Sequence, residues 1–164
     1  MGIVCELYRA SDKLIAEIAS HPQGATNFVN ENFANVEGDL PGDGTESSMD
    51  KGWDVAFFLL KEADPSPNKV LSGWRGKAFD ESNYDTPYYL TSNQVKAMAP
   101  VLAALNHQDI KNAYNLEKME TEEVYRAGSY ILNQWDYFIA HTNEIIDIFK
   151  KAAENNEGII INYS

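Results

Sequence analysis

Cysteine is almost missing from this sequence. A single cysteine, Cys5, occurs in 164 residues, so the chain can form neither an intramolecular disulfide nor a Cys-rich zinc site. Cys5 lies beside Val4 and close to Ile3 and Leu7, and in such surroundings a free cysteine is typical of a small core residue in a strand. The fold is therefore expected to rest on a packed core and not on covalent links.

Long apolar runs are missing as well. No stretch approaches the roughly 18 to 20 consecutive apolar residues that a membrane-spanning helix needs. The opening residues, MGIVCE, have no basic segment and already include an acid, which is unlike a secretory signal. The sequence predicts a protein that does not insert into a membrane and that resides in the cytoplasm.

Basic residues are few. Thirteen Lys and Arg stand against 25 Asp and Glu, which gives a formal net charge of −12 at pH 7. A surface dominated by acids repels phosphate backbones, so binding to nucleic acid is disfavoured. The negative potential of such a surface would attract a basic protein or metal cations. The simpler alternative is that the charge only keeps the protein soluble.

Familiar catalytic and cofactor motifs are absent. The sequence has no glycine-rich dinucleotide turn, no phosphate-binding loop, no G-x-S-x-G and no H-E-x-x-H. The three histidines are far apart, and His141 on a helix edge is expected to be a structural imidazole. Residues 39–50 share Asp43 and Gly44 with a calcium loop, but Pro41 replaces one ligand and Asp50 the required Glu. The sequence predicts no catalytic residue, no metal and no cofactor.

A large apolar content predicts a folded chain. Hydrophobic residues make up 44% and aromatic residues 12% of the sequence, which is too apolar for disorder. No linker separates two parts, so residues 1–164 are predicted to form a single domain. Residues 2–8 and 159–161 are β-branched and apolar, as in strands. Apolar residues at three-to-four spacing over 132–153 predict a long helix near the end of the chain.

These elements predict an α+β fold. In the simplest arrangement, the N- and C-terminal strands pair in a small sheet, which packs against several helices that include the long C-terminal one. A second helix, capped by Ser47 or Ser48 and apolar nearly all round, is expected at the centre of the fold. Shorter elements are predicted over 12–18, 69–73, 87–90 and 108–126, and a capping box starts a helix at Thr91. Residues 23–36 have no assignment.

Two groups of polar and aromatic residues are candidates for a site. Lys51 and Asp54 are three apart beside Trp53, and an Asp on so apolar a helix needs a fixed partner, either Lys51 or backbone amides. Tyr84, Tyr88 and Tyr89, with Trp74 and Arg75, would line a groove for a flat ligand or a peptide, or mark a protein interface. Core packing of some of these rings is the alternative.

Two segments carry a resemblance to a known family. Residues 50–60, DKGWDVAFFLL, are similar to the signature helix K-x-W-D-x-x-H-F-L-L of the YfbM-like family of small uncharacterised bacterial proteins. Residues 87–91, PYYLT, with the following Gln94 and Val95, resemble its second segment, P-R-Y-L-T-x-x-x-V. The resemblance covers nearly the whole chain and implies an α+β fold without an accepted activity. Phe57 replaces the His of the pattern and Tyr88 its frequent Arg, which weakens an enzymatic interpretation.

Two hypotheses about function follow. The first is a non-catalytic binding or interaction protein, immunity-like or regulatory, whose partner is a basic protein. It rests on the acidic charge, the missing catalytic motifs and the surplus of aromatic residues. The alternative is a small-molecule-binding protein or weak enzyme, with a site near Asp54, Arg75 and the strip from Tyr84 to Tyr89. A concave apolar pocket into which Asp54 and Arg75 both point would favour the alternative, and a flat surface there, with Asp54 fixed to the backbone, would exclude it.

Overall fold

The structure, a computed structural model, describes residues 3–34, 46–49, 51–128 and 133–164. Five strands form one antiparallel sheet in the order β2-β1-β5-β4-β3. The strands are β1 (Cys5–Ala10), β2 (Glu46–Met49), β3 (Lys77–Ala78), β4 (Tyr88–Leu90) and β5 (Gly158–Tyr163). The predicted pairing of the N- and C-terminal strands is confirmed, because β1 runs antiparallel to β5 from Cys5 opposite Tyr163 to Ala10 opposite Gly158.

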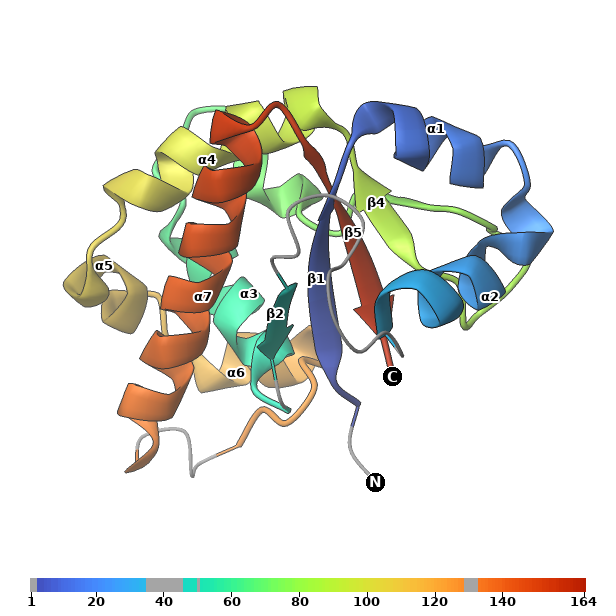
Figure 1. Cartoon of the computed structure of the whole chain (residues 1–164). Coiled ribbons are helices and arrows are strands. Elements are labelled where there is room, and N and C mark those ends of the chain that lie inside the picture. The colour runs from blue at the N-terminus through green and yellow to red at the C-terminus, as the bar shows by residue number, and fades with distance from the viewer. Residues whose placement is uncertain (1–2, 35–45, 50, 129–132) are drawn as a thin grey trace.

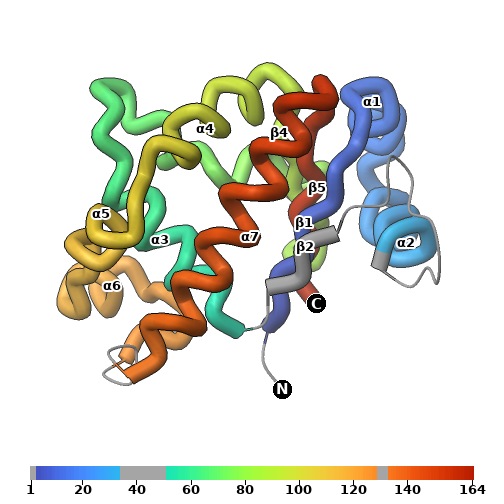
Figure 2. The backbone as a smooth tube through the Cα atoms, turned by 60° about the vertical axis from the view of Figure 1, so that its left-hand side comes forward, coloured from blue at the N-terminus to red at the C-terminus, as the bar shows by residue number. Residues whose placement is uncertain are grey.

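Helices lie on both sides of the sheet, and Figures 1 and 2 show the two groups. One side carries α3 (Trp53–Ala63), α4 (Ser92–Ala104), α5 (His107–Asn112), α6 (Leu116–Thr121) and α7 (Trp135–Glu154). The other side carries α1 (Asp12–Ala19) and α2 (Ala25–Val29), joined by η1 (Pro22–Gly24) and followed by η2 (Asn30–Ala34). The last short helix, η3 (Val70–Gly73), lies between α3 and β3. The α+β class and the long C-terminal helix are as predicted.

The central strand β5 is apolar on both faces because both faces are covered. Ile159 and Ile161 belong to the larger core under α3, α4 and α7. Ile160 belongs to the smaller core under α1 and α2. This alternation follows from the two-residue period of a strand. Cys5 is fully buried in the larger core, as predicted, and burial raises the pKa of its thiol well above the ordinary value.

Helix starts follow the side chains that cap them. Ser11 accepts a hydrogen bond from the Leu14 amide at the start of α1. Thr91 and Gln94 form the predicted capping box at the start of α4. The Asp12 carboxylate accepts a hydrogen bond from the Ser92 amide at 2.8 Å, so α1 on one side of the sheet is tied to the start of α4 on the other.

The expected start of α3 is wrong. Residues 46–49 form strand β2, and α3 begins at Trp53 after Gly52, without a side-chain cap. A Cβ atom on Gly52 would lie 2.6 Å from the Tyr137 ring and 2.9 Å from the His141 ring, so close packing against α7 determines where the helix starts. All eight residues from Trp53 to Leu60 are buried, which confirms the central position predicted for this helix.

Two other segments differ from or extend the sequence prediction. The described part of the segment 23–36, which had no assignment, lies in η1, α2 and η2. The region from 107 to 121 holds the two short helices α5 and α6. The acidic loop over residues 37–44, and with it most of the segment compared with a calcium loop, lies outside the described residues. No helix of the described chain is both long and apolar enough to cross a membrane.

Candidate functional site

Two grooves meet at Arg75. The aromatic groove has a volume of about 660 Å³, and its lining consists of Ile3, Thr26, Asn30, Trp53, Arg75, Tyr84, Asp85, Thr86, Tyr88, Asn162, Tyr163 and Ser164. The polar groove has a volume of about 490 Å³, and its lining consists of Asp54, Phe58, Lys61, Ser72, Gly73, Trp74, Arg75, Gly76, Glu122, Glu123 and Val124. Both volumes fall in the usual range of ligand pockets, roughly 300 to 1,000 Å³. Arg75 is the one residue common to both linings.

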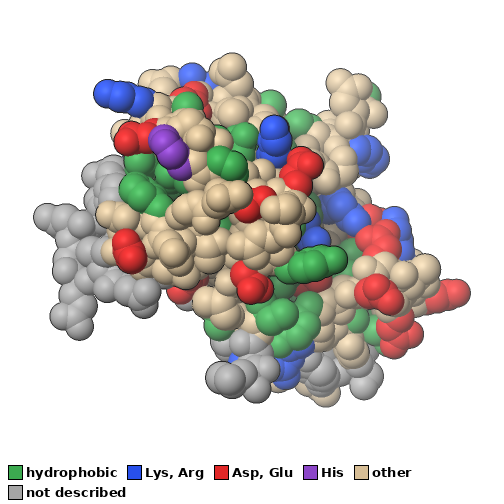
Figure 3. Space-filling model, turned by 90° about the vertical axis from the view of Figure 1, so that its right-hand side faces the viewer, with side chains coloured by type: hydrophobic (Ala, Val, Ile, Leu, Met, Phe, Trp, Pro, Cys, Tyr) green, Lys and Arg blue, Asp and Glu red, His purple; other side chains and the backbone are tan. Residues whose placement is uncertain are grey.

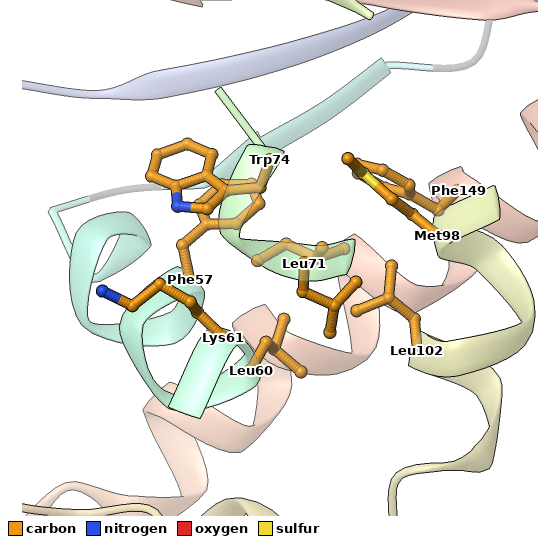
Figure 4. A pocket seen from close by; sticks show the side chains of 9 residues that line it. Phe57, Leu60, Lys61, Leu71, Trp74, Met98, Leu102 and Phe149 are labelled. Atoms are coloured by element: carbon orange, nitrogen blue, oxygen red, sulfur yellow. The ribbon is translucent and has the colours of Figure 1, made fainter. Parts of the chain in front are cut away.

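A third cavity lies in the core and is too small for a ligand. Its volume is about 10 Å³, which is at the lower limit for a single water molecule. Figure 4 shows the Phe57 and Trp74 rings face to face on one side, and Leu71, Met98 and Leu102 on the other. This cavity is a packing defect of the core. A further hollow between α1 and α2 has a volume of about 190 Å³, below the usual range of ligand pockets, so the two grooves are the candidates for a site.

The loop before Arg75 is fixed by Asp64, the residue that follows α3. Its carboxylate accepts hydrogen bonds from the amides of Ser66 at 2.8 Å and Leu71 at 2.9 Å. Burial pushes the pKa of Asp64 upward, but these hydrogen bonds and the nearby Lys69 outweigh it, and the pKa lies below its usual value. The charged carboxylate therefore holds the loop that leads into η3 and on to Arg75.

Arg75 itself is positioned by its neighbours in sequence. Trp74 is buried and stacks on Phe57, with ring centroids 3.8 Å apart and an angle of 7° between the planes. The Arg75 guanidinium lies 5.0 Å from the centroid of the Trp74 ring. Gly76 has a φ of +66°, and a Cβ there would lie 2.0 Å from the Tyr89 carbonyl oxygen. Only glycine fits this turn against β4.

Asp54 has two partners. One carboxylate oxygen accepts a hydrogen bond from the Tyr125 amide at 2.8 Å, and the other lies 3.5 Å from the Arg75 guanidinium. The prediction that a backbone amide would hold Asp54 is confirmed. Lys51, the other predicted partner, lies in the turn before α3 and lines neither groove. Both carboxylate oxygens of Asp54 therefore contact other residues of the protein, and one of them helps to fix the position of the Arg75 guanidinium.

The floor of the aromatic groove consists of connected rings. The Trp53 indole N–H donates to the Ile3 carbonyl oxygen at 3.0 Å, and its ring centroid lies 4.9 Å from that of Tyr163. Tyr88 packs edge-on against Tyr163 at 5.9 Å. Burial raises the pKa of Tyr163 far above its usual value, so the phenol stays protonated. Its hydroxyl has no hydrogen-bond partner among the described residues.

The rim of this groove exposes apolar surface. Ile3 is 47% exposed and Tyr84 is fully exposed, and these are the two large hydrophobic side chains that are exposed in the described part of the chain. Both line the aromatic groove. Exposed apolar side chains that gather at one concave place are typical of binding sites.

The structure brings together most of the predicted site residues. Trp53, Arg75, Tyr84 and Tyr88 line the aromatic groove, and Asp54, Trp74 and Arg75 line the polar groove. Tyr89 does not belong with them, although it was predicted to. It points to the opposite face of β4 and packs on Phe79 with centroids 4.5 Å apart, because successive side chains of a strand alternate between the two faces.

Sequence reasoning missed the groove residues that come from the ends of the described chain. Ile3 and Tyr163 are brought together by the pairing of β1 with β5, in which Cys5 faces Tyr163. The pairing itself was predicted, but not its register, which would have been the signal for these two residues. Thr26 and Asn30 come from the segment without an assignment, so no signal was available for them.

The described residues contain no group of three or more His, Cys, Asp or Glu side chains placed to hold a metal ion. His141 is buried, with its Nδ1 atom 3.1 Å from the Glu144 carboxylate. This pair lies on α7 and lines neither groove. The two grooves present aromatic rings, hydrogen-bonding groups and charged side chains, among them the guanidinium of Arg75.

The fold defines an α+β protein with a groove at the end of its sheet where β1 and β4 begin and β5 ends. The sequence matches the family described as "Domain of unknown function (DUF1877)" over residues 1–162, and the chain belongs to this family. Its structure is similar to the crystal structure of YfbM from Escherichia coli, a protein of unknown function, with a TM-score of 0.68. The sequences are 10% identical over 98% of this chain and 99% of that chain, so the likeness shows the fold alone. No curated protein matches the sequence. The predicted resemblance to the YfbM-like family is confirmed.

Proposed function

We propose that this protein is a non-catalytic binding protein that takes a small molecule into the aromatic groove. One observation carries the proposal: the exposed large hydrophobic side chains of the described chain, Ile3 and Tyr84, both border a concave surface that also presents Arg75. Scattered exposed apolar residues are ordinary, but their gathering at one groove with Trp, Tyr and Arg is typical of recognition surfaces.

The shape of this surface favours a small molecule over a flat protein interface. A volume of about 660 Å³ is suited to a ligand of drug or metabolite size. The walls combine aromatic rings with exposed hydrogen-bonding groups such as Arg75 and Asp85. Such a mixture gives both affinity, through burial of the ligand, and orientation, through a few polar contacts.

The groove is also preorganised. Trp53 is 5% exposed and is fixed by its bond to Ile3 and by its contacts with Tyr125 and Tyr163. A ligand that stacks on a ring already held in place orders fewer side chains on binding, so less of the interaction free energy is lost. Asp54 contributes indirectly, since its bonds to Tyr125 and Arg75 occupy both of its oxygens.

The proposal is tested by ligand-observed NMR with the wild-type protein and a set of small aromatic compounds. Compounds that bind are then measured against Tyr84→Ala and, as the matched control, Tyr84→Phe. We expect Tyr84→Ala to weaken binding severalfold and Tyr84→Phe to keep it, because the stacking ring is retained. If no compound binds at millimolar concentration, or if the alanine variant binds unchanged, the aromatic groove is not the site.

A second candidate function rests on charge. The net charge of −12 supports an interaction with a basic protein, as an immunity-like or regulatory protein would make. Exposed acids lie along α6 and α7, namely Glu117, Glu120, Asp136, Glu144 and Asp147. On the described part of the face that carries α1 and α2, acidic side chains lie among basic and hydrophobic ones (Figure 3).

The dependence of binding on salt concentration distinguishes the two candidate functions. A basic protein held by the acids of α6 and α7 should be released from the immobilised protein by moderate salt, because exposed charges are screened over about 8 Å at physiological ionic strength. The double variant Glu117→Gln, Glu120→Gln should retain less of it, whereas Tyr84→Ala should retain as much as the wild type. Failure to capture any basic protein at low salt would remove this second candidate.

A further inference from the structure

Arg75 is the only Lys or Arg among the described residues that line the aromatic groove. Its side chain is 56% exposed, and the contact with Asp54, at 3.5 Å, is at the outer limit of a hydrogen bond. A guanidinium carries five N–H donors, and within the described chain Asp54 is the single hydrogen-bond acceptor that Arg75 contacts. Most of its donors therefore remain available to a bound molecule.

The guanidinium is held in place despite this exposure. The Trp74 ring lies beneath it at 5.0 Å and Asp54 lies on the side of the polar groove. A planar cation fixed in this way loses little rotamer freedom on binding and presents a two-pronged donor edge that matches a carboxylate. In a protein with a net charge of −12, such an arginine supplies local attraction for an anion that the rest of the surface repels.

We infer that the ligand of the aromatic groove is a small aromatic carboxylate, bound through its carboxylate by Arg75 and through its ring by the tyrosines and tryptophan of the groove. This inference rests on the proposed function and specifies its ligand class. The rings that line the groove are Trp53, Tyr84, Tyr88 and Tyr163, and aromatic rings pack well on one another in offset or edge-on arrangements.

The charge of the groove favours a monoanion. The lining side chains include one cation, Arg75, and one acid, Asp85, whose charges cancel. A bound carboxylate therefore brings the groove to a net charge of about −1, whereas a phosphate monoester would bring it to nearly −2, which is less favourable in a strongly acidic protein. The exposed phenol ring of Tyr84 lies at the rim of the same groove, where it can pack on the ring of the ligand.

A matched series of three probes tests this inference on the wild-type protein. The compounds 4-hydroxyphenylacetate, 4-hydroxyphenylacetamide and tyramine share one ring and differ in being anionic, neutral and cationic. Because hydrogen bonds to charged groups are stronger than neutral ones, we expect the acetate to bind at least about tenfold tighter than the amide. Tyramine should bind most weakly. Chemical-shift titration gives all three dissociation constants.

Variants then assign the preference to Arg75. Arg75→Gln should abolish the difference between the acetate and the amide, while Arg75→Lys should retain part of it. Lys77→Gln is the matched control, because Lys77 is an exposed cation two residues away that lines neither groove. It should leave the preference unchanged. Thermal melting of each variant shows whether it is folded.

The outcomes separate this inference from the proposal on which it rests. If the amide or tyramine binds as tightly as the acetate, the carboxylate class is wrong, although the groove remains the binding site. If a preference for the acetate persists in folded Arg75→Gln, Arg75 does not recognise the carboxylate. If none of the three probes binds the wild type, the carboxylate inference is overturned, and a negative screen of other aromatic compounds would remove the groove as well.

Discussion

The two grooves share Arg75 but differ in how their polar groups are satisfied. In the polar groove, Lys61 pairs with Glu122 at 2.6 Å, and this bond lowers the pKa of Glu122. Asp54 is likewise engaged by Tyr125 and Arg75. In the aromatic groove, Ile3 and Tyr84 are exposed, and most donors of Arg75 have no acceptor within the described chain. Two grooves of similar volume therefore differ in what they offer a ligand. In the polar groove the charged groups pair with one another, whereas in the aromatic groove donors and apolar side chains are available for binding.

The largest expected effect comes from the turn that separates the grooves. Gly76→Ala should lower the free energy of unfolding by about 3 kcal/mol or more, because the new Cβ meets the Tyr89 carbonyl oxygen and the positive φ is strained. Gly73→Ala is the control, since the nearest atom, on Met98, lies at an ordinary 3.5 Å. Urea denaturation of both variants gives the difference. Equal stability of the two would contradict the close approach of this turn to β4.

The loop that leads to Arg75 should show a pH-dependent effect. The folded-state pKa of Asp64 is depressed, so its contribution is present above the unfolded pKa of about 3.9 and is lost as pH falls toward the folded value. Asp64→Asn should therefore lower the free energy of unfolding by about 2 kcal/mol at pH 7. The difference from the wild type should shrink below about pH 4. A difference that does not vary with pH would show that the charge of Asp64 has no such role.

A smaller effect is expected at Asp54. Asp54→Ala leaves the Tyr125 amide without its acceptor and should cost about 1 to 2 kcal/mol in the free energy of unfolding. Asp54→Asn keeps an acceptor oxygen for the Tyr125 amide and loses only the long ion pair with Arg75. It should therefore lower the free energy of unfolding by less than Asp54→Ala. Thermal or urea denaturation ranks the two variants. If the asparagine variant were the less stable one, the ion pair with Arg75 would outweigh the bond to the backbone.

The smallest effect on stability is expected at the rim of the aromatic groove. Tyr84 is fully exposed, so Tyr84→Ala should change the free energy of unfolding by no more than about 0.5 kcal/mol. Tyr89→Ala, on the other face of the sheet, removes a ring packed on Phe79 and should cost about 1 to 2 kcal/mol. Urea denaturation compares them. A large loss at Tyr84 would assign this residue to the fold and not to binding.

Much of the fold could be predicted from the sequence because its strongest signals are local. Neighbouring residues in the sequence are enough to predict the capping box at Thr91, the burial of the apolar helix α3 and the strand formed by the three isoleucines of β5. The start of α3 could not be predicted, because it depends on the contact of Gly52 with Tyr137 and His141 on α7, which are far along the chain. A Ser pair before an apolar run then resembles a helix cap although it belongs to a strand.

The site was predictable in its residue types more than in its geometry. Tyr84, Tyr88, Trp53 and Arg75 were grouped by their chemistry, and the structure places them around one groove. Tyr89 was grouped with them because it is an aromatic neighbour of Tyr88 in the sequence, whereas a strand directs successive side chains to opposite faces. Ile3 and Tyr163 are close only through the register of β1 and β5, a long-range property that local patterns do not report.

The most direct test of the central claim is a ¹H–¹⁵N NMR titration of the wild-type protein with 4-hydroxyphenylacetate. The indole N–H of Trp53, which lies in the aromatic groove, is a distinct reporter, and that of Trp135, which lines neither groove, is an internal control. The account predicts saturable shifts at the Trp53 indole and the amides near Arg75 and Thr86, with the Trp135 indole unchanged. Shifts confined to residues outside the aromatic groove, or no shifts at all, would contradict it.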